Sequence, residues 1–217
     1  MAFCSCYPPP AMPLTVARHA VIDEALARLR DRTTEPEEFR RVAKRVALIL
    51  AAEATRSLAT REGSVETPLE TTRVMRLATR IVAVPILRAG LGMLEPFLEV
   101  VPEAEVGYLG LQRDEETAVA RCYYEKIPRA LDTAEVFVLD PMLATGGSAV
   151  MAVDGLRGMG ARAVQLLSIV AAPEGVAHIE ASCPGTWIWA AALDRELNER
   201  KFILPGLGDF GDRLYGT

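Results

Sequence analysis

The chain has 217 residues, of which half are hydrophobic and about a quarter are charged, a composition typical of a globular protein with a sizeable core rather than of a disordered one. This length fits one α/β domain with an appendage, and a second catalytic domain is not expected. The formal net charge is -5, with acidic and basic residues interspersed. That pattern argues against a basic surface that follows a nucleic-acid backbone, so no nucleic-acid partner is expected.

Residues 1–17 are predicted to form a flexible tail. They lack the basic start and unbroken apolar core of a secretory signal, and the prolines between positions 8 and 13 would interrupt a membrane-spanning helix. The four cysteines are too few and too scattered for a disulfide framework or a paired zinc motif. We therefore expect a cytoplasmic protein with reduced thiols and no membrane partner.

Two amphipathic helices are predicted before the first element of a sheet. Apolar residues recur at helical spacing over residues 16–32. A second helix is predicted to begin with Thr34 as its N-cap and Glu37 completing a capping box, and to continue towards Leu58. The polar residues 61–76 fit either a short hairpin or a loop.

Short β-branched runs then alternate with helical segments. The predicted strands are residues 81–86, 106–111, 135–140, 164–171 and 187–193. This alternation predicts a mostly parallel sheet with helices on its faces. Residues 112–134 are charged and too long for a simple connection, which indicates an arm or flap over a site. No repeat or linker marks a boundary, so residues 18–217 are expected to form a single domain.

The segment 135–148, EVFVLDPMLATGGS, has the features of a phosphate-binding loop. Asp140 ends a buried strand, and ligands of open α/β sheets bind beyond the carboxyl ends of strands. Adjacent glycines let backbone N–H groups face an anion, Thr145 and Ser148 add hydroxyls, and a helix follows. The lysine of a P-loop and the dinucleotide fingerprint are both absent. Taken alone, Thr-Gly-Gly-Ser fits a tight strand-to-helix turn equally well.

The longer stretch DPMLATGGS resembles the phosphoribosyl pyrophosphate (PRPP) motif of the phosphoribosyltransferase family. Most members carry two adjacent acids, and the proline in the second position is similar to the uracil branch of the family. The resemblance implies that Asp140 holds the ribose hydroxyls and that residues 144–148 grip the 5'-phosphate. The PRPP-binding residues implied in this loop are Asp140, Pro141, Met142, Leu143, Ala144, Thr145, Gly146, Gly147 and Ser148.

Two arginines are further candidates for PRPP binding. Arg88 follows a buried strand in VPILRAGLGM, where an arginine can bind phosphate bidentately, although a surface arginine in a turn is the alternative. The matching stretch of the uracil enzymes lies on the pyrophosphate of PRPP, which implies the same role for Arg88. Arg113 lies in QRDEET, which alone is typical of a solvated charged face. Its resemblance to the family's Arg-x-Glu-Glu-Thr implies that Arg113 also reaches PRPP.

The C-terminal segment 202–217, FILPGLGDFGDRLYGT, is too rich in glycine to predict a helix or an ordinary strand. Its PGLGDFGD stretch resembles the uracil-binding loop of the family, in which main-chain groups read the edge of the base. The resemblance implies a base-binding loop at about 202–212, with Asp209 also near PRPP. Phe210 stands where many members have alanine and is expected to tighten the pocket. The implied uracil-binding residues are Ile203, Gly208, Asp209 and Phe210.

The resemblance implies a phosphoribosyltransferase-like fold: a mostly parallel sheet flanked by helices, with N-terminal helices, a protruding arm and a C-terminal base-binding loop. It implies an enzyme that converts uracil and PRPP to UMP and pyrophosphate, with Arg88, Asp140 and Asp209 as catalytic residues. Mg²⁺ would be carried by PRPP without direct protein ligands. A homodimer or larger homo-oligomer is implied, and GTP activates some members, although no residue here identifies a GTP site.

Two other functions would fit parts of this sequence. A phosphoribosyltransferase for a different base would keep the phosphate loop and change the C-terminal loop, and the PGLGD stretch argues against it. A catalytically silent relative that senses PRPP or nucleotides would be expected to have lost Arg88, Asp140 or Asp209, or to have a basic surface. The sequence keeps all three residues and has no such surface.

Overall fold

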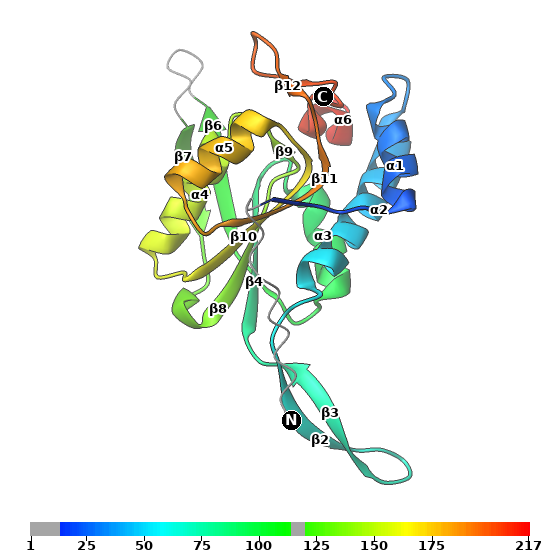
Figure 1. The fold of residues 1–217 in the computed structure, drawn as a ribbon, viewed down its shortest axis with the longest axis vertical. Coiled ribbons are helices and arrows are strands. Elements are labelled where there is room, and N and C mark those ends of the chain that lie inside the picture. The colour runs from blue at the N-terminus through cyan, green and yellow to red at the C-terminus, as the bar shows by residue number, and fades with distance from the viewer. Residues whose placement is uncertain (1–13, 114–119) are drawn as a thin grey trace.

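The computed structural model describes residues 14–113 and 120–217, which fold around one central sheet (Figure 1). The strand order is β1-β11-β10-β8-β4-β6-β7, with the short strands β5 and β9 beside it. Neighbouring strands are parallel except β6 and β7, which are antiparallel. The predicted mostly parallel sheet is therefore confirmed. Its strands are β1 (Leu14–Val16), β4 (Arg80–Leu87), β5 (Glu105–Val106), β6 (Tyr108–Arg113), β7 (Ala120–Lys126), β8 (Ala134–Leu139), β9 (Met142–Leu143), β10 (Ala163–Ala171) and β11 (Trp187–Leu193).

Helices cover both faces of this sheet. One face is packed by α2 and α3, with α1 against α2, and the other by α4, with α5 against α4 (Figure 1). Successive side chains of a strand point to opposite faces: in β8, Val136 and Val138 join the core under α4 and α5, whereas Phe137 and Leu139 join the core under α2 and α3. The helices are α1 (Ala20–Arg30), α2 (Pro36–Thr55), α3 (Leu91–Val100), α4 (Gly147–Gly158), α5 (Pro173–Ser182) and α6 (Phe210–Tyr215). None of those in the described residues combines the length and apolar character needed to cross a bilayer.

The first described residues belong to the sheet. Leu14–Val16 form β1, which pairs in parallel with β11, so the helix predicted from residue 16 starts later than expected. It begins at Ala20, where His19 is the N-cap and its Nδ1 accepts a hydrogen bond from the N–H of Val21 at 3.1 Å. Residues 14–17 were predicted to belong to the flexible tail, but Leu14–Val16 form this strand and the N–H of Ala17 donates to the carbonyl oxygen of Ala190 at 2.8 Å. Residues 1–13 lie outside the described residues, and their flexibility stays a prediction.

The capping box predicted for α2 is wrong. Thr34 instead donates its hydroxyl to the carbonyl oxygen of Arg28 at 2.6 Å, and Glu35 occupies the N-cap without a capping side-chain bond. Pro36 explains the difference: its fixed φ and missing N–H suit the first helical position, so the helix starts there.

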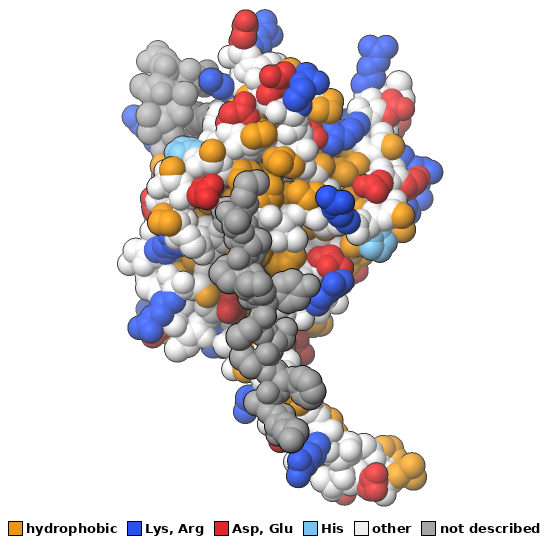
Figure 2. Space-filling model, in the orientation of Figure 1, with side chains coloured by type: hydrophobic (Ala, Val, Ile, Leu, Met, Phe, Trp, Pro, Cys, Tyr) orange, Lys and Arg blue, Asp and Glu red, His pale blue; other side chains and the backbone are white. Residues whose placement is uncertain are grey.

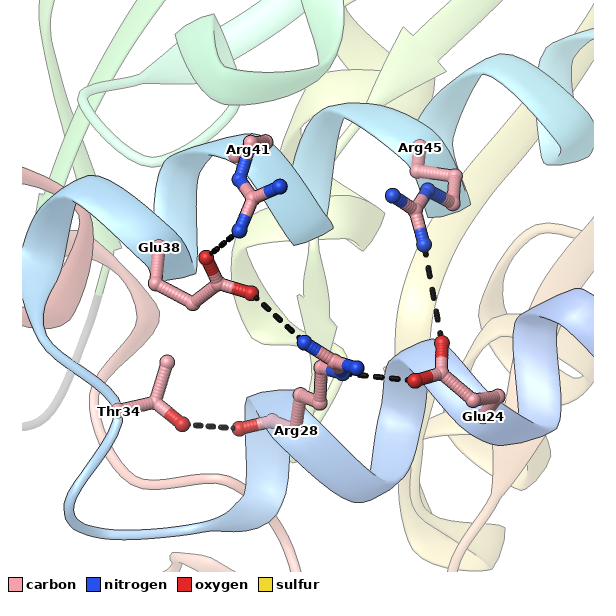
Figure 3. A network of polar contacts seen from close by, with 6 residues as sticks. All are labelled: Glu24, Arg28, Thr34, Glu38, Arg41 and Arg45. Carbon is pink, nitrogen blue, oxygen red and sulfur yellow. Dashed lines mark hydrogen bonds and ion pairs between the residues drawn. The ribbon is translucent and has the colours of Figure 1, made fainter.

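An exposed polar network joins α1 to α2 (Figure 3). Arg28 binds Glu24 at 2.7 Å and Glu38 at 3.2 Å, Arg41 pairs with Glu38, and Arg45 lies 3.7 Å from Glu24. Because surface ion pairs contribute little to stability, we attribute the packing of these helices to their buried apolar faces.

Residues 61–76, for which the sequence allowed either a hairpin or a loop, form a hairpin. β2 (Thr60–Glu66) and β3 (Thr71–Leu77) pair antiparallel along their whole length and project from the body of the protein (Figures 1 and 2). The hairpin leads into the amino end of β4, a strand of eight residues whose first and last residues lie about 23 Å apart. It therefore lies at the end of the sheet opposite the carboxyl ends of the parallel strands.

The predicted arm is in large part an edge of the sheet. The strand expected at 106–111 is divided into β5 and β6, and β7 returns antiparallel to β6. A 3-10 turn, η1 (Leu131–Thr133), then leads into β8. The intervening residues 114–119 lie outside the described residues, so the role of a flap stays a prediction.

Candidate active site

The carboxyl ends of β4 and β8 place two of the predicted residues side by side. The two strands are parallel, with Pro85 opposite Leu139, so Arg88 and Asp140 both follow at the same edge of the sheet. Gly90 packs tightly here: a Cβ at this position would lie 2.3 Å from the carbonyl oxygen of Leu139. A side chain on Gly90 would therefore displace the loop of Arg88 from the chain that leads into Asp140.

Residues 141–143, directly after Asp140, are packed mainly against the rest of the protein and support the phosphate loop. Asp140 is partly exposed, and its Oδ1 lies 3.4 Å from the N–H of Met142. Met142 and Leu143 form β9 against β10, and the side chains of Pro141 and Leu143 are buried. Pro141 and Leu143 were predicted to bind PRPP. Because their side chains are buried, they can contact PRPP only through the main chain.

Residues 144–148 form the turn into α4, with Gly146 as the N-cap at φ +80°. The carbonyl of Thr145 points towards α5, where Nδ1 of His178 donates to it at 2.8 Å. Because the C=O and N–H of a trans peptide point in opposite directions, the N–H of Gly146 is directed away from α5. Together with the positive end of α4, this arrangement can bind an anion. His178 was missed in the sequence, where an exposed helical histidine gives no signal.

The side chain of Arg88 extends over α6. Its guanidinium lies 5.9 Å from the centre of the Tyr215 ring and 4.0 Å from Oδ1 of Asp212, and the Tyr215 hydroxyl donates to the carbonyl oxygen of Arg88 at 3.2 Å. Partial desolvation raises the pKa of Tyr215 above its ordinary value, against a smaller opposing effect of Arg88. The loop after β4 thus contacts the helix that follows the candidate base-binding loop.

Arg113 is the last residue of β6, which lies next to β4 in the sheet. It is thus at the same edge as the loop of Arg88. Its predicted contact with PRPP stays a prediction, because its side chain lies outside what the structure describes.

The predicted base-binding loop connects β13 (Ile203–Leu204) to α6, and β13 pairs antiparallel with β12 (Glu196–Leu197). Gly206 and Gly208 have φ of +61° and +84°. Gly208 and Asp209 are exposed, whereas the side chain of Ile203 is buried. Oδ1 of Asp209 caps α6 by accepting from the N–H of Asp212 at 2.9 Å.

Two expectations for this loop were wrong. Phe210–Tyr215 form a helix despite the glycines, because Asp209 caps it and its apolar side chains Phe210 and Leu214 are buried. The ring of Phe210 packs edge-on against Phe39 in the core, with ring centres 5.2 Å apart. The ring therefore does not tighten a pocket, and only the main chain of Phe210 is available to a base.

Three residues outside the predicted set hold this loop. Arg30 binds the carbonyl oxygen of Gly206, and Asp194 accepts from its N–H. Arg213 binds the carbonyl oxygen of Leu207. Arg30 ends α1, 176 positions before Gly206, whereas Asp194 follows β11 only 12 positions before it, and Arg213 lies 6 positions after Leu207. The spacing of these residues in the sequence does not indicate that they contact one another or this loop.

The chain is similar to known proteins along nearly its whole length. The family model described as uracil phosphoribosyltransferase matches residues 16–217. A uracil phosphoribosyltransferase of Streptococcus agalactiae is 46% identical over 203 residues, which cover 93% of this chain and 97% of the relative. A uracil phosphoribosyltransferase of Symbiobacterium thermophilum is also 46% identical, covering 94% of this chain and 98% of its own length.

Solved structures agree with this similarity. A protein of Aquifex aeolicus superposes with a TM-score of 0.90 at 38% identity, covering 94% of this chain and 98% of that one. A hypoxanthine-guanine phosphoribosyltransferase of Bacillus anthracis superposes with a TM-score of 0.51 at 11% identity, covering 72% of this chain and 79% of its own. The second likeness concerns the fold alone.

Proposed function

This chain belongs to the uracil phosphoribosyltransferase family and is an enzyme of pentosyl transfer, and we propose that it joins uracil to the phosphoribosyl group of PRPP. The products are UMP and pyrophosphate, in pyrimidine salvage. The observation that carries the proposal is the contact between two loops: Arg88, beside Asp140 and the phosphate loop, reaches Tyr215 of the helix that follows the PGLGD loop. One site can therefore hold PRPP and a base together.

The reaction replaces one bond at C1 of the ribose with another. N1 of uracil bonds to C1 as the C1–oxygen bond to pyrophosphate breaks, pyrophosphate leaves with the bonding electrons, and the N1 proton is released. The transition state has oxocarbenium character, so no protein nucleophile is required. Catalysis then depends on positioning the two substrates and on stabilising the charge that grows on the leaving group.

We assign the binding of PRPP to the loops after β4 and β8. Residues 144–148 bind the 5'-phosphate through main-chain N–H groups and the amino end of α4, which is supported by the direction of the Thr145 carbonyl. Asp140 holds the ribose hydroxyls, and Arg88 and Arg113 stabilise the leaving pyrophosphate. The side chain of Arg88 is 62% exposed, which leaves it accessible to a charged substrate.

We assign the binding of uracil to the main chain between Ile203 and Phe210. Uracil presents two carbonyl acceptors beside the N3–H donor, whereas cytosine has an amino donor at position 4. A fixed backbone N–H that faces O4 would meet the amino group of cytosine donor to donor, which is costly in a closed site. We also assign to Asp209, which is the N-cap of α6, a contact near the reacting region.

Magnesium is proposed to arrive bound to PRPP. The carboxylate of Asp140, beside the phosphate loop, would contact the ion through the ion's water molecules. When bound, the ion would neutralise charge on the pyrophosphate. A cytoplasmic homo-oligomer completes the proposal, and GTP is the activator to be tested in the same assay.

The proposal is tested by incubating the protein with PRPP, Mg²⁺ and uracil, cytosine, adenine or hypoxanthine in turn. We expect UMP and pyrophosphate in equal amounts from uracil, and at most traces of product from the other bases. Turnover of a purine at the rate of uracil would contradict the proposal. An Asp140→Asn variant, which keeps the side-chain shape but removes the charge, is the matched control for contaminating activity.

A further inference from the structure

The main chain of Gly206, inside the candidate base-binding loop, is held at both of its polar atoms. Its N–H donates to Oδ2 of Asp194 at 2.8 Å, and its carbonyl oxygen accepts from Nη1 of Arg30 at 2.8 Å. Arg30 and Asp194 also bind each other through two hydrogen bonds, at 2.8 and 2.6 Å. Gly206 is thus part of a closed set of hydrogen bonds with one arginine and one aspartate.

The Arg30–Asp194 pair is itself fixed to the scaffold. Arg30 is the last residue of α1, and Asp194 directly follows β11, where its N–H donates to the carbonyl oxygen of Ala171 at 2.8 Å. The side chain of Asp194 is only 4% exposed and that of Arg30 26%. A charge buried to this degree requires its partner, because removal of one member leaves the other uncompensated. The side chains of Arg30 and Asp194 are therefore fixed in one position relative to each other.

The loop is tightly folded at this point. Gly206 has φ +61°, and a Cβ there would lie 2.2 Å from the carbonyl oxygen of Ile203. No other residue fits this conformation without moving the chain. The position of Gly206 relative to Ile203 therefore depends on the hydrogen bonds that hold the glycine, which come from the Arg30–Asp194 pair.

A second arginine holds the next carbonyl. Arg213 donates to the carbonyl oxygen of Leu207 at 2.8 Å and to that of Asp31 at 2.6 Å, and its guanidinium lies 4.5 Å from the centre of the Phe39 ring. The carbonyls of Gly206 and Leu207 are thus both held by arginines that contact the carboxyl end of α1. Because C=O and N–H point in opposite directions across each trans peptide, the N–H groups of Leu207 and Gly208 are directed away from α1.

We propose that Arg30 and Asp194 are positioning residues for base selection, which act through Gly206 without touching the base. They fix the peptide groups on either side of Gly206 and Arg213 fixes the next one, so that the N–H donors of the loop face a single pattern of acceptors on the base. The inference rests on the proposed function, since it takes the loop from Ile203 to Phe210 as the reader of uracil. It adds residues from α1 and the end of β11 to the determinants of specificity.

The test compares Arg30→Lys, which keeps the charge but loses the planar fork, with a double variant, Arg30→Met with Asp194→Leu. The double variant replaces the buried pair by apolar residues, an exchange that proteins often tolerate, while removing both contacts to Gly206. Arg28→Ala is the matched control, because Arg28 lies on the same helix and forms exposed ion pairs (Figure 3). Thermal unfolding is measured for each protein.

Steady-state kinetics provide the decisive readout. In both variants we expect the KM for uracil to rise about tenfold or more, as hydrogen bonds to charged groups imply. The preference for uracil over cytosine in kcat/KM should fall by a similar factor, while the KM for PRPP stays within about twofold of wild type. Arg28→Ala should leave all three quantities unchanged.

Three outcomes would overturn the inference: a folded double variant with wild-type selectivity, equal rises in the two KM values, or a double variant that fails to fold. The last would make the pair a requirement of the fold. Failure of the proposed function is a separate result, because it would appear as wild-type protein that does not convert uracil. If the wild type converts uracil and the double variant discriminates as well, only the inference fails.

Discussion

The two loops of the candidate site are held in different ways. The phosphate loop is supported by the elements that follow it: Leu143 accepts from the N–H of Ala172, and Thr145 from His178 on α5. The base-binding loop is held by Asp194, 12 positions before Gly206, and also by Arg30, which lies 176 positions before it. The first loop is therefore held by elements that follow it within 33 residues, whereas the second also needs a residue from the first helix of the chain.

The difference predicts that the two substrates can be affected separately. Changes around the phosphate loop should alter the use of PRPP and leave the choice of base intact. Changes around the base-binding loop should alter the choice of base and leave the KM for PRPP intact.

The largest effect is expected for Arg88→Ala. Removal of a cation that stabilises the leaving pyrophosphate should lower kcat/KM for PRPP by about 100-fold to 1,000-fold. The melting temperature should change little, because the side chain is exposed. Steady-state kinetics with PRPP and with pairs of competing bases will check this. Near wild-type turnover, or altered discrimination between uracil and cytosine, would contradict the assignment.

Gly208→Val should have the next largest effect, confined to the base. Gly208 has φ +84°, a conformation that costs a β-branched residue about 1–3 kcal/mol, so the loop should shift. We expect discrimination between uracil and cytosine to fall by about tenfold, with the KM for PRPP retained. Ile203→Val and Leu207→Met leave the backbone path intact and should keep the discrimination. Normal selectivity in Gly208→Val would argue against readout by the main chain.

The same contrast explains what the sequence could predict. The strand before Asp140, the glycine turn and the start of α4 are contiguous, so hydrophobic pattern and residue type were enough to predict them. The resemblance to a known family then supplied the chemistry, and the comparisons confirmed the family. The direction of the Thr145 carbonyl could not be predicted, because it depends on His178 of a different helix.

The base-binding loop was predicted less well for a physical reason. Local composition suggested a segment without a helix, but burial of Phe210 and Leu214 against the rest of the core stabilises α6. The partners of Gly206 and Leu207 come from α1, from the end of β11 and from Arg213. Such contacts are determined by packing of the whole chain, and no local pattern encodes them.

A smaller effect is expected for His178→Ala. Loss of the hydrogen bond to the Thr145 carbonyl, worth about 0.5–1.5 kcal/mol, should raise the KM for PRPP roughly threefold to tenfold. The choice of base should not change. Glu180→Ala, an exposed residue of the same helix, is the matched control. If both variants raise the KM equally, or if neither does, His178 does not position the phosphate loop.

The smallest effect is expected for Tyr215→Phe, which removes the hydroxyl that binds the Arg88 carbonyl and keeps the ring under its guanidinium. This contact is between the two regions, so both KM values should rise, each by about twofold to threefold. Parallel titrations of PRPP and uracil will measure the two changes. An effect on one substrate alone would show that the hydroxyl does not link the two loops.

The central claim is that the main chain of one loop reads uracil while a separate loop binds the phosphate. A crystal structure of the protein with UMP tests it most directly. We expect the 5'-phosphate against residues 144–148, the oxygens of uracil within hydrogen-bonding distance of main-chain atoms between Ile203 and Phe210, and the Arg30–Asp194 pair still bound to Gly206. A base held chiefly by side chains, or one bound away from this loop, would contradict the account.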